Sequence, residues 1–319
     1  MVEVRDTYGR TFKTLRVSLI NTCNLGCIYC TYGNDEQKEN YKSYKDHSLS
    51  PADLAHSITQ LHQSLNLDTI RFTGGEPLLY KELPELVKSV KLAGIPNLKL
   101  TTNGLLLEGL AEKLKDSGIT AINVSLDAID EDVFYAMSRR SGINRIFSGI
   151  DAALKAGIDV KINTVIMKGL NDSQILPLLQ YAFSKGITIR FLEIMAMGHL
   201  YGNADSSFFS QEEILALISQ KHEFKRLSRK SSSTANYWIT EEGYTFGIVA
   251  NESEPFCSDC NRLRLDSYGN IYGCLSSNHP ISIKDVSDDE LINRLQEALQ
   301  QKQAIRFAGS ELSMMHIGG

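Results

Sequence analysis

Features that would place the chain in a membrane, outside the cell or on a nucleic acid are missing. No run of about 18 apolar residues is present, so no transmembrane helix is expected. The first residues, Met1 to Asp6, lack the basic and then apolar layout of a secretory signal. The net charge of −5 provides no basic excess for a nucleic acid or a membrane surface. We therefore expect a cytoplasmic protein that binds neither a nucleic acid nor a membrane.

Cysteine is scarce, and the six cysteines of this 319-residue chain fall into two groups of three. They are Cys23, Cys27 and Cys30 in the first group and Cys257, Cys260 and Cys274 in the second. A large chain without a secretory signal has little need of disulfides, so we interpret the groups as two metal sites. Sulfur ligands select iron–sulfur clusters, zinc or copper.

The number of cysteines in each group favours a cluster. Three thiolates on a four-iron cluster leave one iron with an open position for another ligand. A structural zinc site usually takes four nitrogen or sulfur ligands. The first group has no fourth Cys or His close by, whereas His279 could complete a zinc site at the second. Buried thiols without a metal are the remaining alternative.

Strand patterns alternate with helix patterns between the two cysteine groups. Strands are predicted over residues 15–20, 69–73, 98–102, 121–125, 160–165 and 188–193. Helices are predicted from Pro51, behind the N-cap Ser50, then over 83–92, around 107–114 up to Gly118, and over 143–156 and 173–184. About six βα units predict an α/β fold, either an open (partial) βα barrel or a doubly wound sheet, because a closed barrel needs eight.

The pattern changes after Gly198 to a smaller C-terminal α+β region. A helix is predicted to begin at Ser210, hairpins to form within 237–248 and 263–275, and a helix over 288–302. The basic, serine-rich segment 225–234 and the polar segment 31–48 are predicted to be loops. We expect two domains, residues 1–200 with the first cysteine group and residues 201–319 with the second.

Several motifs together resemble known families. The first cysteine motif, Tyr29 before its last cysteine, and Thr73-Gly74-Gly75-Glu76-Pro77-Leu78 resemble the radical S-adenosylmethionine superfamily. Further segments resemble, in order and spacing, the GTP 3′,8-cyclase family of molybdenum-cofactor biosynthesis. They are residues 101–104, 125–127, 161–165, 190–193, 257–264 and 318–319.

The resemblance implies a lyase that converts GTP to 3′,8-cyclo-7,8-dihydro-GTP in the first step of that pathway. Its implied cofactors are two [4Fe-4S] clusters and S-adenosylmethionine. A radical would take the ribose 3′ hydrogen, and the ribose carbon would then attack guanine C8. The implied partners are GTP, the cyclic pyranopterin monophosphate synthase that acts next, and a reductant protein of the flavodoxin or ferredoxin type. A homodimer is compatible with these roles.

The resemblance also implies a role for each site residue. Cys23, Cys27 and Cys30 would hold the cluster that binds S-adenosylmethionine, and Cys257, Cys260 and Cys274 the auxiliary cluster that binds guanine. The residues implied to line S-adenosylmethionine are Tyr29, Gly75, Ser125 and Met195. Those implied to contact GTP are Arg16, Arg71, Thr101, Lys161, Arg262 and Arg264. Gly318 and Gly319 would reach into the site and take part in the reaction.

The chemistry of the arginines agrees with these roles. Guanidinium groups bind phosphate oxygens in bidentate fashion. Arg262 and Arg264 alternate on one predicted strand and therefore share a face. A single strand arginine is more often a solvated surface charge, but these arginines stand beside two metal motifs.

Some positions depart from the family pattern. Asn21-Thr22 stands where Asp-Arg is usual, Gly26 where an arginine is usual, and Thr69 where a lysine that helps to hold the triphosphate is common. The alternative is therefore a radical S-adenosylmethionine paralogue, with an auxiliary cluster, that modifies another small molecule or a peptide. A non-enzymatic sensor or scaffold that binds iron–sulfur or zinc would leave the barrel motifs and the strand arginines unexplained.

Overall fold

The computed structural model describes residues 4–31, 47–203 and 205–318. Within these ranges it places 12 strands in one sheet, in the order β12-β11-β10-β1-β2-β3-β4-β5-β6-β9-β8-β7. The strands are β1 Thr14–Ser18, β2 Thr69–Thr73, β3 Asn97–Thr102, β4 Ile119–Ser125, β5 Asp159–Ile166, β6 Thr188–Glu193, β7 Phe224–Arg226, β8 Asn236–Thr240, β9 Thr245–Val249, β10 Arg262–Leu265, β11 Asn270–Tyr272 and β12 Ile281–Ser282.

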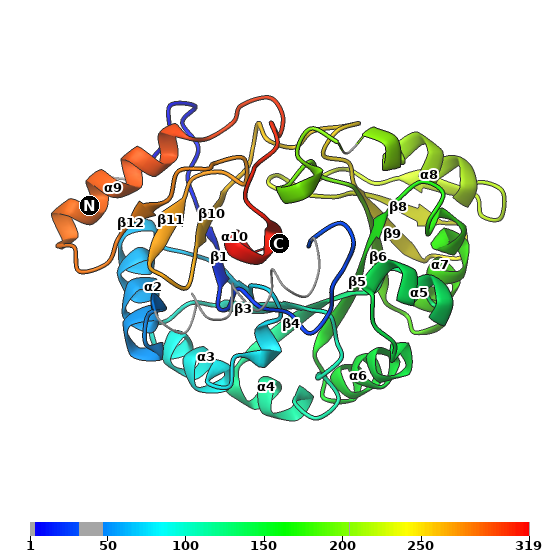
Figure 1. Cartoon of the computed structure of the whole chain (residues 1–319), viewed down its shortest axis with the longest axis horizontal. Helices are drawn as coiled ribbons and strands as arrows, with labels where there is room; N and C mark the ends of the chain where they lie inside the picture. The colour runs from blue at the N-terminus through cyan, green and yellow to red at the C-terminus, as the bar shows by residue number, and fades with distance from the viewer. Residues whose placement is uncertain (1–3, 32–46, 204, 319) are drawn as a thin grey trace.

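The sheet curves into an arc with helices on its outside (Figure 1). Strands β1 to β6 pair in parallel, and two strands of the C-terminal region continue them, β10 beside β1 and β9 beside β6. The strand order ends at β12 and β7, so the predicted open, partial βα barrel with a smaller C-terminal region is confirmed. The division near residue 200 stays a prediction, because strands from both sides of it share the sheet.

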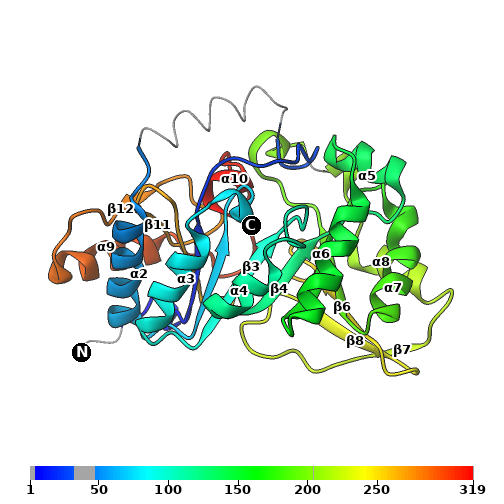
Figure 2. The same ribbon diagram turned by 90° about the horizontal axis from the view of Figure 1, so that it is seen from below.

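Most helices cover the outer face of the arc, where Figure 2 shows α2, α3, α4 and α6 in sequence. The α-helices are α2 Pro51–Leu65, α3 Leu83–Leu92, α4 Ala111–Ser117, α5 Glu131–Ser138, α6 Ile143–Lys155, α7 Ile175–Ser184, α8 Gln211–Ile218, α9 Asp288–Gln300 and α10 Met314–Ile317. Short 3-10 helices are η1 Pro77–Leu79, η2 Asp172–Gln174, η3 Gly198–Leu200 and η4 Asp205–Ser207. Across the described ranges, no helix has both the length and the apolar character needed to span a bilayer.

Local sequence explains where these elements begin and end. Helix α2 begins where Ser50 accepts a hydrogen bond from the Asp53 amide, with Pro51 in the first turn, and it buries Leu54, Ile58 and Leu61. The predicted bounds of α3 and β2 are confirmed. The predicted helix around 107–114 is shorter, because residues 104–110 form successive turns before α4 begins at Ala111. Helix α5 was not predicted.

Most of the basic segment 225–234 is a loop, as its composition predicts, and half of its residues are exposed. Its first two residues belong to β7, which pairs with β8, and residues 230–234 line the cavity described below. The Ser232 amide and hydroxyl donate hydrogen bonds to Asp259, each at 2.7 Å, and hold the segment there. Of the predicted loop 31–48, residues 32–46 lie outside the described residues.

Candidate functional site

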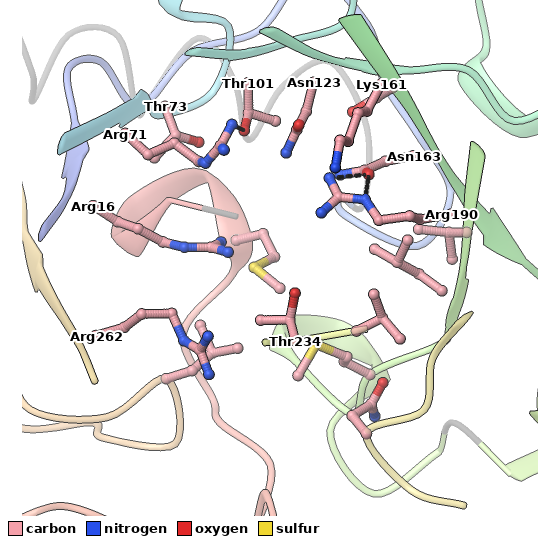
Figure 3. Close-up of a pocket in the computed structure, with 18 of the residues that line it drawn as sticks. Arg16, Arg71, Thr73, Thr101, Asn123, Lys161, Asn163, Arg190, Thr234 and Arg262 are labelled. Atoms are coloured by element: carbon pink, nitrogen blue, oxygen red, sulfur yellow. Dashed lines mark hydrogen bonds between the residues drawn. The ribbon is translucent and has the colours of Figure 1, made fainter. Parts of the chain in front are cut away.

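A cavity of about 890 Å³ occupies the inside of the arc. Strand side chains alternate between the two faces of a sheet, so every second residue points into it. On β2, Thr69, Arg71 and Thr73 line the cavity, while Ile70 and Phe72 are fully buried in the hydrophobic core. Figure 3 shows arginine, lysine, asparagine and threonine side chains from several strands around the same space.

The cavity brings together nearly all the site residues that the sequence predicted. All six cysteines line it. So do the predicted cofactor-binding and GTP-binding residues Tyr29, Gly75, Ser125, Met195, Arg16, Arg71, Thr101, Lys161, Arg262 and Arg264. Gly318 is not among the lining residues, and Gly319 lies outside the described residues. The two cysteine groups therefore open on one space, although most of the chain separates them in sequence.

The first cysteine group lies on a loop that follows β1. The C-terminus of α5 holds this loop, because the amides of Gly26 and Ile28 each donate at 2.9 Å to main-chain carbonyls of residues 138 and 137. The Asn103 side-chain amide donates to the Cys23 sulfur at 3.6 Å. Burial, together with the charge of Glu76, raises the pKa of Cys23 to about 12. The loop therefore presents protonated thiols, which must lose their protons to bind iron.

The glycine motif after β2 packs directly on the same loop. The Gly75 amide donates to the Ile20 carbonyl at 2.6 Å, and the Glu76 amide donates to the Thr22 carbonyl at 2.7 Å. A side chain on Gly75 would overlap the Thr22 main chain, so the close approach requires glycine here. The Glu76 carboxyl accepts hydrogen bonds from Thr102 Oγ1 at 2.6 Å and from the amides of Leu78 and Asn103. Burial nevertheless raises the pKa of Glu76 to about 7.

A second buried carboxyl lies opposite, after β4. Tyr29 donates its phenolic hydrogen to Asp127 Oδ2 at 2.8 Å, and the Val165 amide donates to Asp127 Oδ1 at 2.9 Å. Burial raises the pKa of Asp127 to about 6. These contacts fix the Tyr29 ring between the first cysteine group and the ends of β4 and β5.

Lysine and arginine charges surround the second cysteine group. Lys302, which is 6% exposed, donates to Cys260 Sγ at 3.6 Å. Burial alone would raise the pKa of Cys260, but the charges of Lys302 and Arg262 and hydrogen bonds from Arg262 lower it to about 6. Arg229 forms two hydrogen bonds to Asp259, within the same cysteine loop, at 2.7 and 2.9 Å. Cys260 therefore favours a thiolate more than Cys23 does.

The donor atoms fit iron–sulfur clusters. None of the six cysteines, all of which are described, is joined in a disulfide. Burial raises the pKa of Cys27, and the charges of Asp127, Cys23 and Cys30 add to it, so the first three thiols lie near one another. In the described ranges no three Cys, His, Asp or Glu side chains are grouped as for a single metal ion. Three thiols suit a [4Fe-4S] cluster with one open iron better than a structural zinc ion, which takes four nitrogen or sulfur ligands.

The rest of the cavity is strongly cationic. Its lining includes two carboxylates, Glu76 and Asp127, against the cations Arg16, Arg71, Lys99, Lys161, Arg190, Lys230, Arg262, Arg264 and Lys302. Burial and the charges of neighbouring arginines lower the pKa of Arg16 well below its ordinary value. Burial, with the charge of Arg190, lowers the pKa of Arg71 to about 9. Crowding like charges in a buried space is unfavourable unless an anion binds among them.

Several cavity residues carry chemistry that the sequence analysis did not assign. Arg190 on β6 donates to Asn163 Oδ1 at 2.9 and 2.6 Å (Figure 3). Lys99 on β3 and Lys302 after α9 also line the cavity. Strand alternation with Thr101 on β3 could have indicated Lys99, and Arg190 stands in the segment 190–193 that carries part of the family resemblance. No local signal marks Lys302, because only the packing of α9 brings it to Cys260.

The C-terminal segment enters the arc from the side of β10. Figure 1 shows α10 inside the arc of strands. Arg264 donates from Nη1 to the carbonyl of Ile317 at 3.1 Å and also to that of Gly318. Met314 and Met315 line the cavity, while Gly318 packs against Thr73. Gly318 therefore lies beside strand residues at the edge of the site, and it is not itself among the residues that line the cavity.

Sequence comparisons cover both halves of the chain. The model of the Radical SAM superfamily matches residues 17–182, and the one described as Molybdenum Cofactor Synthesis C matches residues 187–308. A GTP 3′,8-cyclase of Nautilia profundicola is 37% identical over 300 residues, which cover 93% of this chain and 91% of that protein. A GTP 3′,8-cyclase of Synechocystis sp. is 35% identical over 314 residues, which cover 98% and 94%.

The fold is similar to solved structures as well. The structure of Streptococcus suis SuiB bound to its precursor peptide SuiA matches with a TM-score of 0.67 and 15% identity. The match covers 91% of this chain and 66% of SuiB, and at that identity it concerns the fold alone. The curated relatives are matched over both cysteine groups. The chain therefore belongs to the GTP 3′,8-cyclase family of the radical SAM superfamily.

Proposed function

We propose that this protein is a GTP 3′,8-cyclase, a lyase that converts GTP to 3′,8-cyclo-7,8-dihydro-GTP in molybdenum-cofactor biosynthesis. One observation carries the proposal: both groups of three thiols and nine cationic side chains line the same cavity. An enzyme that makes a reactive radical must hold its substrate within reach of it, and one cavity shared by both cysteine groups provides such a place.

The first cysteine group is proposed to hold a [4Fe-4S] cluster with S-adenosylmethionine on its open iron. When bound, these groups supply a 5′-deoxyadenosyl radical able to take hydrogen from an unactivated carbon. Tyr29, Gly75, Ser125 and Met195 are proposed to line S-adenosylmethionine. The close approach of Gly75 to the Ile20 carbonyl brings main-chain groups to the cavity, and the Asn103 amide orients the Cys23 sulfur.

The second cysteine group is proposed to hold an auxiliary [4Fe-4S] cluster whose open iron binds guanine. Lys302 is proposed to stay protonated beside Cys260 and to hydrogen-bond the ligating sulfur, since the sulfur is its nearest anionic partner. Arg262 contacts the Ser232 carbonyl at 2.8 Å and lies 5.3 Å from the centre of the Phe256 ring. These contacts favour a fixed guanidinium at the edge of the guanine position.

The triphosphate is proposed to bind between the strand cations on the opposite side of the cavity. Arg16, Arg71, Thr101 and Lys161 come from the sequence prediction, and Arg190 joins them. Lys161 lies 5.5 Å above the Tyr237 ring, which leaves its ammonium group directed into the space (Figure 3). Arg264, which donates to the tail carbonyls, is proposed to position Gly318 and Gly319 as well as to meet the nucleotide.

The partners follow from this chemistry as proposals. The protein would take electrons from a flavodoxin-type or ferredoxin-type reductant, and a cyclic pyranopterin monophosphate synthase would consume its product. A cytoplasmic location and a homodimeric state are the corresponding expectations. The division into residues 1–200 and 201–319 would separate the cluster that binds S-adenosylmethionine from the auxiliary cluster.

The test is anaerobic reconstitution with iron and sulfide, followed by turnover with S-adenosylmethionine, a chemical reductant and GTP. We expect about eight irons per chain, and 5′-deoxyadenosine together with a cyclic nucleotide only when GTP is present. Cys23→Ala should abolish S-adenosylmethionine cleavage, while Lys88→Gln on the outside of α3 should not change it. Cleavage at the same rate without GTP, and without a nucleotide product, would point to a paralogue with another substrate.

A further inference from the structure

Four cations stand in direct register across four neighbouring strands. Arg16 on β1 pairs with Arg264 on β10 and with Arg71 on β2, and Arg71 pairs with Lys99 on β3. All four side chains line the cavity. Paired strands are about 4.8 Å apart, and like charges on directly opposed residues are destabilising. An anion bound in the cavity beside this row would therefore relieve the repulsion between the four cations.

The four cations of the row differ in whether their side chains already form hydrogen bonds within the protein. Arg264 donates to the Ile317 carbonyl at 3.1 Å, and Arg71 donates to the Leu100 carbonyl at 2.9 Å. The side chain of Lys99 forms no hydrogen bond or ion pair with any residue in the described part of the chain. It is half-buried, so its ammonium group is partly withdrawn from water without a protein partner. The Arg16 side chain also forms none among the described residues, and its Nε is buried. Lys99 and Arg16 are therefore the two members of the row most available to a ligand.

The surroundings of Lys99 are cationic on the cavity side. Burial lowers the pKa of Lys99, the charges of Arg71, Lys161 and Arg190 lower it further, and Asp159 opposes them. Asp159 is exposed and is not among the cavity-lining residues. A bound anion between Lys99, Arg71 and Lys161 would reverse this unfavourable balance, since each of the three could donate to a separate oxygen.

Thr69 provides the reason why this chain needs such a residue. The family resemblance implies a lysine at this position, whereas in this chain Thr69 lines the cavity on the strand next to Lys99. Thr69 is paired with Asn97, two residues before Lys99, so both positions face the same part of the cavity. A lysine side chain is long enough to reach an anion from either strand.

We propose that Lys99 binds the phosphate chain of the nucleotide and supplies the positive charge that Thr69 lacks. The nucleotide's identity as GTP rests on the proposed function, whereas anion binding by Lys99 does not. Lys99 is a substrate-binding residue in this proposal and takes no part in bond making.

The experiment measures binding of inorganic tripolyphosphate, GTP and guanosine to the reconstituted protein by calorimetry. We expect Lys99→Gln to weaken tripolyphosphate and GTP by about tenfold and to leave guanosine unchanged. Lys99→Arg should stay within about threefold of the unaltered protein, because it keeps the charge. Lys88→Gln, an exposed lysine on α3, is the control and should change none of the three. Circular dichroism and iron content confirm that each variant is folded and loaded.

A second variant tests whether a lysine at position 69 on β2 can replace Lys99 on β3. Thr69→Lys combined with Lys99→Gln should restore tripolyphosphate binding to within about threefold. If the double variant stays as weak as Lys99→Gln, Lys99 does not stand in for a lysine at position 69. If Lys99→Gln binds tripolyphosphate like the unaltered protein, the proposal is overturned even when cyclase activity is present. Weakened tripolyphosphate binding without any nucleotide product would instead keep Lys99 as an anion site and remove GTP as substrate.

Discussion

Arg264 Nη1 donates a hydrogen bond to the main-chain carbonyl of Ile317 at 3.1 Å, and this bond joins β10 to the C-terminal segment. Both residues are buried, Arg264 at 7% and Ile317 at 1% exposure. Burial lowers the pKa of Arg264 to about 10, although the thiols of Cys274 and Cys260 oppose that shift. The same strand thus carries a cation of the cavity and the anchor of the tail.

Removing this anchor should release the tail. Arg264→Ala breaks a buried, charged hydrogen bond, so we expect a loss of about 2 kcal/mol in the free energy of unfolding. Amides of residues 314–318 should exchange with deuterium much faster in this variant, while those of β1 to β6 stay protected. Arg294→Ala on the exposed face of α9 is the control and should change neither. Unchanged exchange at residues 314–318 would show that other contacts hold the tail.

Gly75 should not tolerate a side chain. A methyl group there would overlap the main chain of Thr22, and neither segment can move without disturbing the first cysteine loop. We expect Gly75→Ala to cost about 3 kcal/mol of stability and to reduce iron loading at the first site. Gly109→Ala is a matched control, since no atom lies near its added methyl group. Equal iron content in the two variants would contradict the close packing described here.

The buried carboxyl of Glu76 should make stability depend on pH. Burial raises its pKa from 4.5 to about 7, so the folded chain holds this proton more tightly than the unfolded chain does. The free energy of unfolding should therefore fall as pH rises from about 4.5 to 7, by on the order of 2 kcal/mol from this group. Asp127 acts in the same direction, because burial raises its pKa to about 6.

Denaturant titrations of the cluster-free chain at pH 5 and pH 8 measure this effect. Glu76→Gln should lose less stability between the two pH values than the unaltered chain, since it cannot ionise. Glu85→Gln, on the exposed side of α3, should keep the full dependence. An identical pH dependence in Glu76→Gln would mean that Glu76 is ionised throughout this range.

Thiol reactivity should separate the two cysteine groups. Lys302 and Arg262 help to lower the pKa of Cys260 to about 6, whereas burial raises that of Cys257 to about 11 and that of Cys23 to about 12. In the anaerobic, cluster-free chain at pH 7, we expect iodoacetamide to modify Cys260 at least about tenfold faster than either. Lys302→Met should slow this reaction, and peptide mass spectrometry reads each site. Equal rates at the three cysteines would remove Lys302 from this role.

Several elements of the fold and both metal sites can be predicted from the sequence. The period of two in Thr69, Arg71 and Thr73 predicts a strand, and Ser50 with Pro51 predicts the start of α2. The cysteine spacings predict two metal sites. These features are local, so neighbouring residues are enough to reveal them.

What the sequence could not predict depends on contacts between distant segments. The register of Arg71 with Lys99 exists only once β2 and β3 pair, and Lys302 reaches Cys260 only because α9 packs beside β11. Composition predicts the loop at residues 225–234, but it does not predict that Ser232 binds Asp259 or that residues 230–234 line the cavity. No local sequence pattern predicts that Arg264 donates a hydrogen bond to the main chain of Ile317.

The central claim is that a radical generated at the first cysteine group reaches a GTP molecule held by the strand cations and the second group. The direct measurement is turnover of the reconstituted protein with GTP deuterated at the ribose 3′ position, with mass spectrometry of the 5′-deoxyadenosine formed. We predict that the deuterium appears in 5′-deoxyadenosine and that its formation depends on GTP. Unlabelled 5′-deoxyadenosine, formed equally well without the nucleotide, would contradict the claim.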